Sequence, residues 1–158
     1  MPNAGFSLIE VLVFTCITTI LATIGIQQWK SLQLRNELIV TTQQLAYFLN
    51  EVQVMAYTHN DTYNLYHFSS PWCLAVTKEE RPNNCEQGLL KFNKPYASVV
   101  INGLTDKKTI SFWGRRNMAQ TMSFQLKNDI GMTKVIISFR GRIRFCSQNN
   151  FLAGLPQC

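Results

Sequence analysis

The sequence predicts an α+β fold in which one long N-terminal helix precedes a small antiparallel β domain. Three observations predict this fold. Residues 6–57 contain no proline and are first apolar throughout and then amphipathic. Residues 58–158 consist instead of short alternating runs separated by turn residues. The total of 158 residues allows one globular domain with an appendage, which excludes collagen, low-complexity polymers and multidomain enzymes.

The first half of the predicted helix, residues 6–26, is long and apolar enough to span a membrane. It has 21 residues and a single charge, Glu10. At 1.5 Å rise per residue it covers roughly 30 Å, the thickness of the hydrocarbon core of a bilayer. A core helix of a soluble protein is seldom apolar on all sides over this length. A secretory signal peptide would carry a basic residue before the apolar run, whereas here the first is Lys30, after the run.

The second half of the predicted helix, residues 27–57, is amphipathic. Apolar residues recur in it at helical spacing, namely Leu38, Leu45, Leu49, Val52 and either Met55 or Ala56. An apolar face of this kind packs against a domain. We therefore expect residues 27–57 to continue the helix and to pack on the C-terminal domain, residues 58–158.

Eight short strands are expected in the C-terminal domain. Their ranges are 62–68, 72–77, 89–92, 98–101, 109–113, 121–126, 134–139 and 142–146. Gly, Pro, Asn, Asp and Ser clusters separate them, as at Ser69-Ser70-Pro71 and Asn102-Gly103. Many short strands at a spacing of about 8–12 residues predict an antiparallel sheet or sandwich.

The five cysteines divide into four plus one. Cys16 lies in the apolar helix, and we expect it there to be a small buried hydrophobe. The other four allow three pairings, of which two local bridges, Cys73–Cys85 and Cys146–Cys158, are the simplest. Each closes a loop worth roughly 3 kcal/mol, and disulfides require an oxidising compartment such as the periplasm. Reduced thiols are the alternative.

The sequence nominates no metal site and no catalytic site. It has no C-x-x-C pair, and His59 and His67 have no cysteine nearby at metal-ligand spacing. It also lacks the G-x-S-x-G, P-loop and dinucleotide-binding motifs. We expect His59 in a loop and His67 on a solvated strand face. The sequence therefore predicts neither an enzyme nor a bound cofactor.

The net charge of +6 is concentrated in the last third of the chain. Residues 1–106 carry six basic and eight acidic side chains, whereas residues 107–158 carry nine basic ones and a single acid, Asp129. Such asymmetry favours contact with a polyanion or an anionic lipid surface. Charges spread only for solubility are the alternative.

The densest basic motif is Arg140-Gly141-Arg142-Ile143-Arg144. We expect Arg140-Gly141 to be the two-residue turn of a hairpin, with Arg142 and Arg144 on one face of the following strand. Two guanidinium groups about 7 Å apart along a strand match the spacing of successive phosphates, and each suits phosphate oxygens bidentately. Further basic residues extend the patch, namely Arg115, Arg116, Lys107, Lys108 and Lys134.

At the N-terminus a short polar leader ends at Gly5, and the apolar run opens Phe-Ser-Leu-Ile-Glu. This boundary resembles the class III signal of type IV pilins and type II secretion pseudopilins. The resemblance implies that prepilin peptidase cuts between Gly5 and Phe6 and methylates the new amino group of Phe6. It also implies that Glu10 directs assembly by pairing with the α-amino group of a neighbouring pilin, because an acid within a membrane needs a partner. The leader carries no Lys or Arg, so the orientation is inferred from the resemblance.

The C-terminal third resembles the minor pilins of the FimT/GspH family. The segments W-C-L-A-V, F-W-G-R-R-N and G-R-I-R-F-C are most similar to the subgroup called prepilin peptidase-dependent protein A. The resemblance implies a pilin-like fold, inner-membrane anchoring with a periplasmic domain, and assembly with other major and minor pilins. Some members of this family bind DNA during natural transformation through a G-R-x-R element, which corresponds here to Arg142 and Arg144.

Two functions follow from these observations. In one, the chain is a minor pilin that primes or caps a type IV pilus and also contacts double-stranded DNA without sequence preference for uptake. In the other, it is an H-type minor pseudopilin of a type II secretion system with no nucleic-acid role. Under either function the basic residues could instead have a structural role or contact an anionic lipid.

Overall fold

The computed structural model describes residues 7–103, 109–148, 152 and 154–158. The chain forms two compact units, Met1–Gln33 and Leu34–Cys158. One continuous helix, α1 (Leu8–His59), runs through both of them. The predicted α+β fold is confirmed, and α1 ends two residues beyond the predicted limit of residue 57.

In the first unit, α1 is apolar and its side chains are exposed, with Leu8, Phe14 and Leu21 all more than 60% accessible. Its threonines satisfy their hydroxyl groups within the helix. For example, Thr19 donates to the carbonyl of Thr15 and Thr23 to that of Ile20. The helix contains a window with a mean hydropathy of 2.2, which is long and apolar enough to cross a membrane. This composition suits a single-pass membrane anchor.

In the second unit, α1 buries the face that the helical spacing predicts. Leu38, Leu45, Leu49, Val52 and Ala56 are fully buried. At about 1.5–3 kcal/mol for each buried Leu or Val, this face supplies much of the free energy that fixes the helix on the domain. The same face also buries the polar side chains Thr41, Thr42 and Gln53, which the apolar spacing did not indicate.

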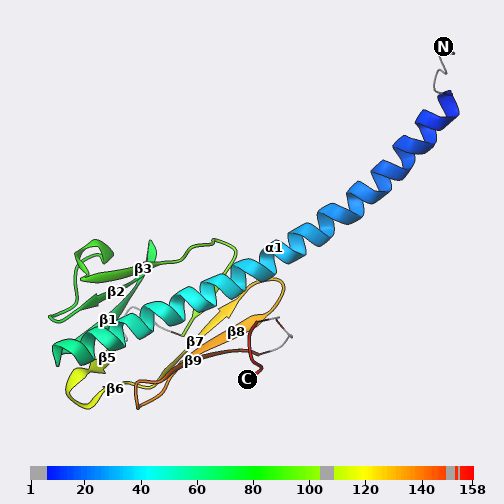
Figure 1. The fold of residues 1–158 in the computed structure, drawn as a ribbon. Coiled ribbons are helices and arrows are strands. Elements are labelled where there is room, and N and C mark those ends of the chain that lie inside the picture. The colour runs from blue at the N-terminus through cyan, green and yellow to red at the C-terminus, as the bar shows by residue number, and fades with distance from the viewer. Residues whose placement is uncertain (1–6, 104–108, 149–151, 153) are drawn as a thin grey trace, which may run out of the picture. The chain divides into compact units, whose positions relative to one another are not determined.

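Among the described residues, nine strands form two antiparallel sheets beside the second half of α1 (Figure 1). The five-stranded sheet has the order β3-β2-β1-β5-β6. Its strands are β1 (Thr62–Ser69), β2 (Trp72–Thr77), β3 (Leu90–Asn93), β5 (Ile110–Trp113) and β6 (Met118–Ala119). The four-stranded sheet has the order β4-β7-β8-β9. Its strands are β4 (Val100–Asn102), β7 (Met122–Lys127), β8 (Met132–Ile137) and β9 (Ile143–Ser147).

One hydrophobic core joins the helix to both sheets. It includes Leu45 from α1, Phe112 from the five-stranded sheet and Val135 from the four-stranded sheet. Two polar contacts fix the helix along the second sheet. The hydroxyl groups of Thr42 and Thr133 lie 2.7 Å apart in the core, and Nδ2 of the Asn128 side chain donates to the carbonyl oxygen of Leu34 at 2.7 Å. Buried polar groups that are paired in this way specify one helix position.

Both histidine predictions are wrong. His59 is the last residue of α1 rather than a loop residue, and its Nδ1 lies 2.9 Å from the Met55 carbonyl oxygen. His67 lies in β1 but is only 8% exposed, with its ring 5.6 Å from that of Trp72. The alternation in β1 fails here because Leu65, Tyr66 and His67 are buried in succession.

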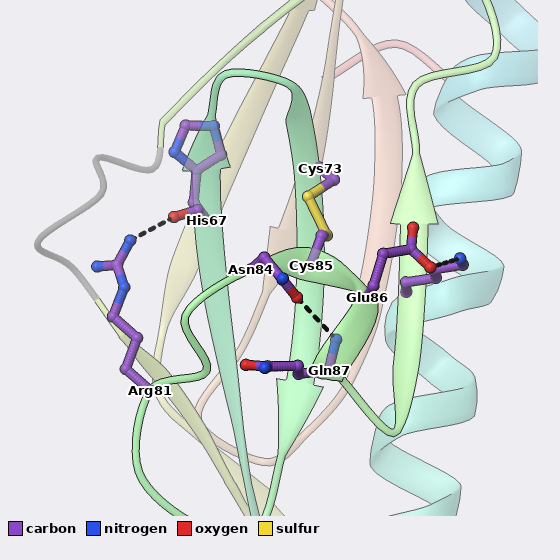
Figure 2. Close-up of a disulfide and its surroundings, with 8 residues drawn as sticks. His67, Cys73, Arg81, Asn84, Cys85, Glu86 and Gln87 are labelled. Carbon is purple, nitrogen blue, oxygen red and sulfur yellow. Dashed lines mark hydrogen bonds and ion pairs between the residues drawn. A yellow bond between two sulfur atoms is a disulfide. The ribbon is translucent and has the colours of Figure 1, made fainter.

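The structure contains disulfides between Cys73 and Cys85 and between Cys146 and Cys158, the two local bridges that the spacing favours. The first joins β2 to the short 3-10 helix η1 (Cys85–Gln87), where the Asn84 side chain accepts a hydrogen bond from the Gln87 amide (Figure 2). Cys16 is a free thiol, and its side chain is exposed in this chain rather than buried as expected.

Candidate nucleic-acid interface

Four of the predicted DNA-binding arginines lie in two loops of the second unit. Arg115 and Arg116 belong to the 3-10 helix η2 (Gly114–Arg116), which follows β5. Arg140 and Arg142 lie in the connection between β8 and β9. We refer to these four arginines as the basic end. The two loops meet because both pack on the C-terminal end of α1.

The η2 loop packs on the C-terminal end of α1. Asn60 has φ +54°, the left-handed conformation common just after a helix, and the Asp61 amide donates to the Ala56 carbonyl oxygen at 3.1 Å. The Gly114 amide donates to the Asp61 carbonyl at 2.9 Å. A Cβ at Gly114 would lie 2.0 Å from the Ala56 oxygen, so only glycine permits this approach.

The hairpin turn between β8 and β9 differs from the two-residue turn predicted at Arg140-Gly141. The Gly141 amide donates to the Ser138 carbonyl, and the Ser138 amide donates to the Arg142 carbonyl, both at 3.0 Å. The loop is therefore the three residues Phe139-Arg140-Gly141, with Gly141 left-handed at φ +68°. A single left-handed glycine suits this longer loop, whereas a two-residue turn of type I′ needs positive φ at both positions.

Gly141 brings the hairpin loop onto the same helix end. Its ideal Cβ position lies 2.6 Å from Nε2 of Gln53 and 3.1 Å from the carbonyl oxygen of Asn117. Gln53 is 6% exposed and donates from Nε2 to the Asn117 side chain at 2.6 Å. Because Asn117 directly follows Arg116, its hydrogen bond with Gln53 holds the η2 loop on the helix. Gly141 packs on both Gln53 and Asn117. The two arginine loops are thus in direct contact.

Hydrogen bonds also fix the position of Arg142. Its carbonyl oxygen accepts from the Ser138 amide at 3.0 Å and from the Ser138 hydroxyl at 3.1 Å. Next to it, the Phe139 carbonyl accepts from the Ala119 amide at 3.0 Å, which joins this loop to β6 of the other sheet. The basic end is therefore built on ordered backbone.

The side chains of the basic end face solvent, and all four arginines are exposed. Within the residues that the structure describes, their guanidinium groups form neither ion pairs nor hydrogen bonds. Exposed arginines without intramolecular acids contribute little to the stability of a fold. They remain available for an anionic partner.

Lys134 and Arg144 form a second basic pair on the four-stranded sheet. Lys134 is opposite Cys146, and Arg144 is opposite Ile136. The two cations are therefore diagonal neighbours on one face of the β8–β9 pair, while Ile143 and Phe145 pack against the core. Arg144 thus lies on the strand face away from the core, whereas Arg142, predicted on the same face of this strand, precedes β9 (Ile143–Ser147).

An ion pair lies beside the basic end. Nζ of Lys78 is 3.0 Å from Oδ2 of Asp61, and Asp61 Oδ1 accepts the Thr62 amide at 2.8 Å. The hydrogen bond from Lys78 and then that from Thr62 lower the pKa of Asp61. The hydrogen bonds that Lys78 forms with Asp61 and then with Tyr63 raise the pKa of Lys78. Both groups thus stay charged and paired.

The predicted cleavage and methylation residues, Gly5 and Phe6, lie outside the described residues, as do Lys107 and Lys108. Glu10 lies in the first turn of α1 with an exposed side chain. In the described part of the chain, no group of three or more His, Cys, Asp and Glu side chains could hold a metal ion.

Sequence reasoning missed the residues that assemble the two loops, namely Gln53, Asn117, Gly114 and Ser138. The repeated Gly-Arg pattern was one available signal, because Gly114 directly precedes Arg115 and Gly141 directly precedes Arg142. Gln53 gave no signal, since a polar residue between helical apolar positions looks like a solvent-facing one.

Comparison with solved structures shows the fold of pilins. The type IV minor pilin FimU of Pseudomonas aeruginosa matches in one crystal form with a TM-score of 0.58 and 16% identity, over 78% of this chain and 95% of FimU. A second crystal form gives 0.56 and 14%, over 76% and 98%. The minor pseudopilin EpsH from the type 2 secretion system of Vibrio cholerae matches at 0.54 and 7%, over 72% and 99%. No protein-family model and no curated protein sequence matches the chain.

The chain therefore has the pilin fold, a long N-terminal helix packed on antiparallel sheets. Type IV minor pilins and type II secretion pseudopilins share this fold, and the identities of 7–16% show likeness of fold alone.

Proposed function

We propose that the chain is a minor pilin of a type IV pilus, in the FimT/GspH family, that primes or caps the filament and contacts DNA through its basic end. Prepilin peptidase would cut after Gly5 and methylate Phe6. Before assembly, the apolar half of α1 would anchor the chain in the inner membrane with the second unit in the periplasm. The proposed role is structural and binding rather than catalytic.

Assembly with other pilins depends in this proposal on Glu10. Its carboxylate is exposed in the first turn of an otherwise uncharged apolar segment. A charge in that environment requires a partner of opposite sign, and the amino terminus of a neighbouring pilin supplies one.

The assembly proposal is tested by replacing Glu10. In the source bacterium, Glu10→Ala should abolish recovery of the protein in sheared filaments, while Glu10→Gln tests the charge alone. The matched control is Glu51→Ala, which removes an exposed glutamate from the second half of the same helix. Normal incorporation of the Glu10→Ala chain would contradict the proposed pairing.

The observation that supports DNA contact is the meeting of two arginine loops on one helix end. Four exposed guanidinium groups lie there, and none of them forms an ion pair with an acid among the described residues. Lys134 and Arg144 add two cations on the adjoining sheet. Contacts of this kind read phosphates rather than bases, so double-stranded DNA would be bound without sequence preference and less tightly as salt rises.

DNA contact is tested by a mobility shift of the full chain in detergent micelles with duplex DNA at low salt. We expect the variant Arg142→Gln/Arg144→Gln to bind more weakly than the wild type. The matched control is Lys91→Gln/Lys94→Gln, which removes two charges at β3, the edge of the five-stranded sheet opposite β6. Equal binding by the arginine variant would remove these two residues from the interface.

The second candidate is an H-type minor pseudopilin, which the fold likeness to EpsH favours. For a pseudopilin we expect that the chain does not bind DNA and that it is recovered with a secretion pseudopilus. Absence of binding by the wild type at low salt would favour this candidate over a DNA-binding minor pilin.

A further inference from the structure

An open groove of about 600 Å³ lies beside the basic end, at the C-terminal end of α1. Its lining combines the two kinds of side chain that contact nucleic acids, namely aromatic or apolar ones and basic ones. Trp113, Phe139 and Met118 supply apolar surface, while Arg115 and Arg116 supply positive charge.

The two aromatic rings are exposed, although the backbone that carries them is fixed. Trp113 is 37% and Phe139 is 57% accessible. Trp113 is paired in the sheet with both Thr62 and Met118. Phe139 is held through its carbonyl oxygen, which accepts the Ala119 amide at 3.0 Å. Exposed aromatic rings on an ordered backbone form a stacking surface at low entropic cost.

The charge of the groove favours an anion. Arg115 and Arg116 line it, and Arg140 directly follows Phe139 in the hairpin loop. The carboxylate in the lining, Asp61, is already paired with Lys78 at 3.0 Å. Its negative charge is therefore largely compensated and opposes a phosphate only weakly.

We propose that this groove takes an unpaired base of single-stranded DNA, stacked on Trp113 or Phe139, with Arg115 and Arg116 on the adjoining phosphates. The inference rests on the proposed DNA contact and adds a preference to it. Bases in a duplex are stacked on each other and cannot reach the rings, whereas every unpaired base offers a π-face. The groove thus strengthens binding of single strands, overhangs and frayed ends, and leaves phosphate contacts to duplex DNA unchanged.

The experiment measures fluorescence anisotropy of labelled oligothymidylate and of a labelled duplex with the full chain in zwitterionic nanodiscs. The test variants are Trp113→Leu and Phe139→Leu, which remove the ring but keep apolar bulk. The control is Tyr47→Leu, which removes an aromatic ring that is 69% exposed on α1. Loss of a stacked base should weaken binding of the single strand by about fivefold or more, with duplex affinity unchanged and the control unaffected.

The outcomes separate this inference from the proposed function. If the wild type binds duplex DNA and both ring variants keep full affinity for oligothymidylate, the stacking site is wrong while the DNA contact stands. Equal loss for single strand and duplex would also overturn it. If the wild type binds neither nucleic acid, the proposed function itself fails. Should Trp113→Leu fold poorly, Phe139→Leu alone decides, because that ring is the more exposed of the two.

Discussion

Both the backbone conformation and the close packing at position 141 require a glycine, and a comparison with Gly154 separates the two effects. Its φ of +68° is strained for any residue with a side chain. Its Cβ position also overlaps the Gln53 amide, at 2.6 Å. Gly154 shares the first reason only, since it has φ +91° and nothing within 4 Å of its Cβ position.

We therefore predict that Gly141→Ala lowers the free energy of unfolding by about 1–3 kcal/mol, and by more than Gly154→Ala does. The difference measures the contact between the hairpin loop and Gln53. Denaturant unfolding of the two full-length variants in detergent, followed by tryptophan fluorescence, checks it. Equal destabilisation by both substitutions would show that Gly141 does not pack on the helix end.

The Asp61–Lys78 pair gives a prediction about acid stability. Because its folded-state pKa lies below the ordinary value of 3.8, Asp61 stabilises the fold at pH values above that value. The contribution is lost as the pH falls through the lowered pKa of the folded state. Asp61→Asn should therefore be less stable than the wild type near neutral pH, and the two should converge in strong acid. Thermal unfolding from neutral pH down to pH 2 measures this, and a difference that grows in acid would contradict it.

At the scale of elements, periodicity predicted most of the fold. The single α-helix and eight of the nine strands in the described residues follow from spacing alone, and no end is displaced by more than two residues. Strand β6 was missed because it has only two residues, Met118–Ala119, and is defined by pairing with β5 rather than by its own pattern. His67 was misplaced for a similar reason, because tertiary packing on Trp72 overrides the alternation of β1.

The candidate site was predicted in composition but not in geometry. The arginines could be named from the charge asymmetry, since charge density is a property of the sequence. Their meeting could not be predicted, because it depends on Gly114 and Gly141 both approaching α1 and on the Gln53 side chain between them. Such contacts join residues more than fifty positions apart and leave no local pattern.

The C-terminal tail provides the prediction at this scale. The tail is joined to β9 by the Cys146–Cys158 disulfide and by hydrogen bonds from Ser147 to Pro156 and from Cys158 to Ser147. The double variant Cys146→Ser/Cys158→Ser should lower the free energy of unfolding by about 3 kcal/mol. Denaturant unfolding measures the change.

The matched variant for that experiment is Cys73→Ser/Cys85→Ser, which opens a loop with the same separation of 12 residues. Loop closure alone predicts similar losses for the two bridges. An unchanged unfolding midpoint on removal of Cys146 and Cys158 would show that the buried tail residues Leu152 and Leu155 hold the tail without the bridge.

At the scale of the whole molecule, the N-terminal part proposed for anchoring and assembly and the C-terminal part proposed for DNA contact differ in charge. The sequence before residue 107 is slightly acidic and includes the apolar anchor, whereas residues 107–158 carry the entire positive excess. The fold gathers four of those charges into two touching loops and places two more on the adjoining sheet. Both of these clusters lie in the unit formed by Leu34–Cys158.

The salt dependence of DNA binding tests whether the four arginines of the basic end contact phosphates. The affinity of the full chain for duplex DNA would be measured over a series of salt concentrations, for the wild type and for a variant with Arg115, Arg116, Arg140 and Arg142 all changed to Gln. Each phosphate contact contributes about −0.9 to the slope of log affinity against log salt. We predict weaker binding by the variant and a slope shallower by up to about 3.6, which corresponds to four such contacts. The same slope and affinity in both chains would contradict it.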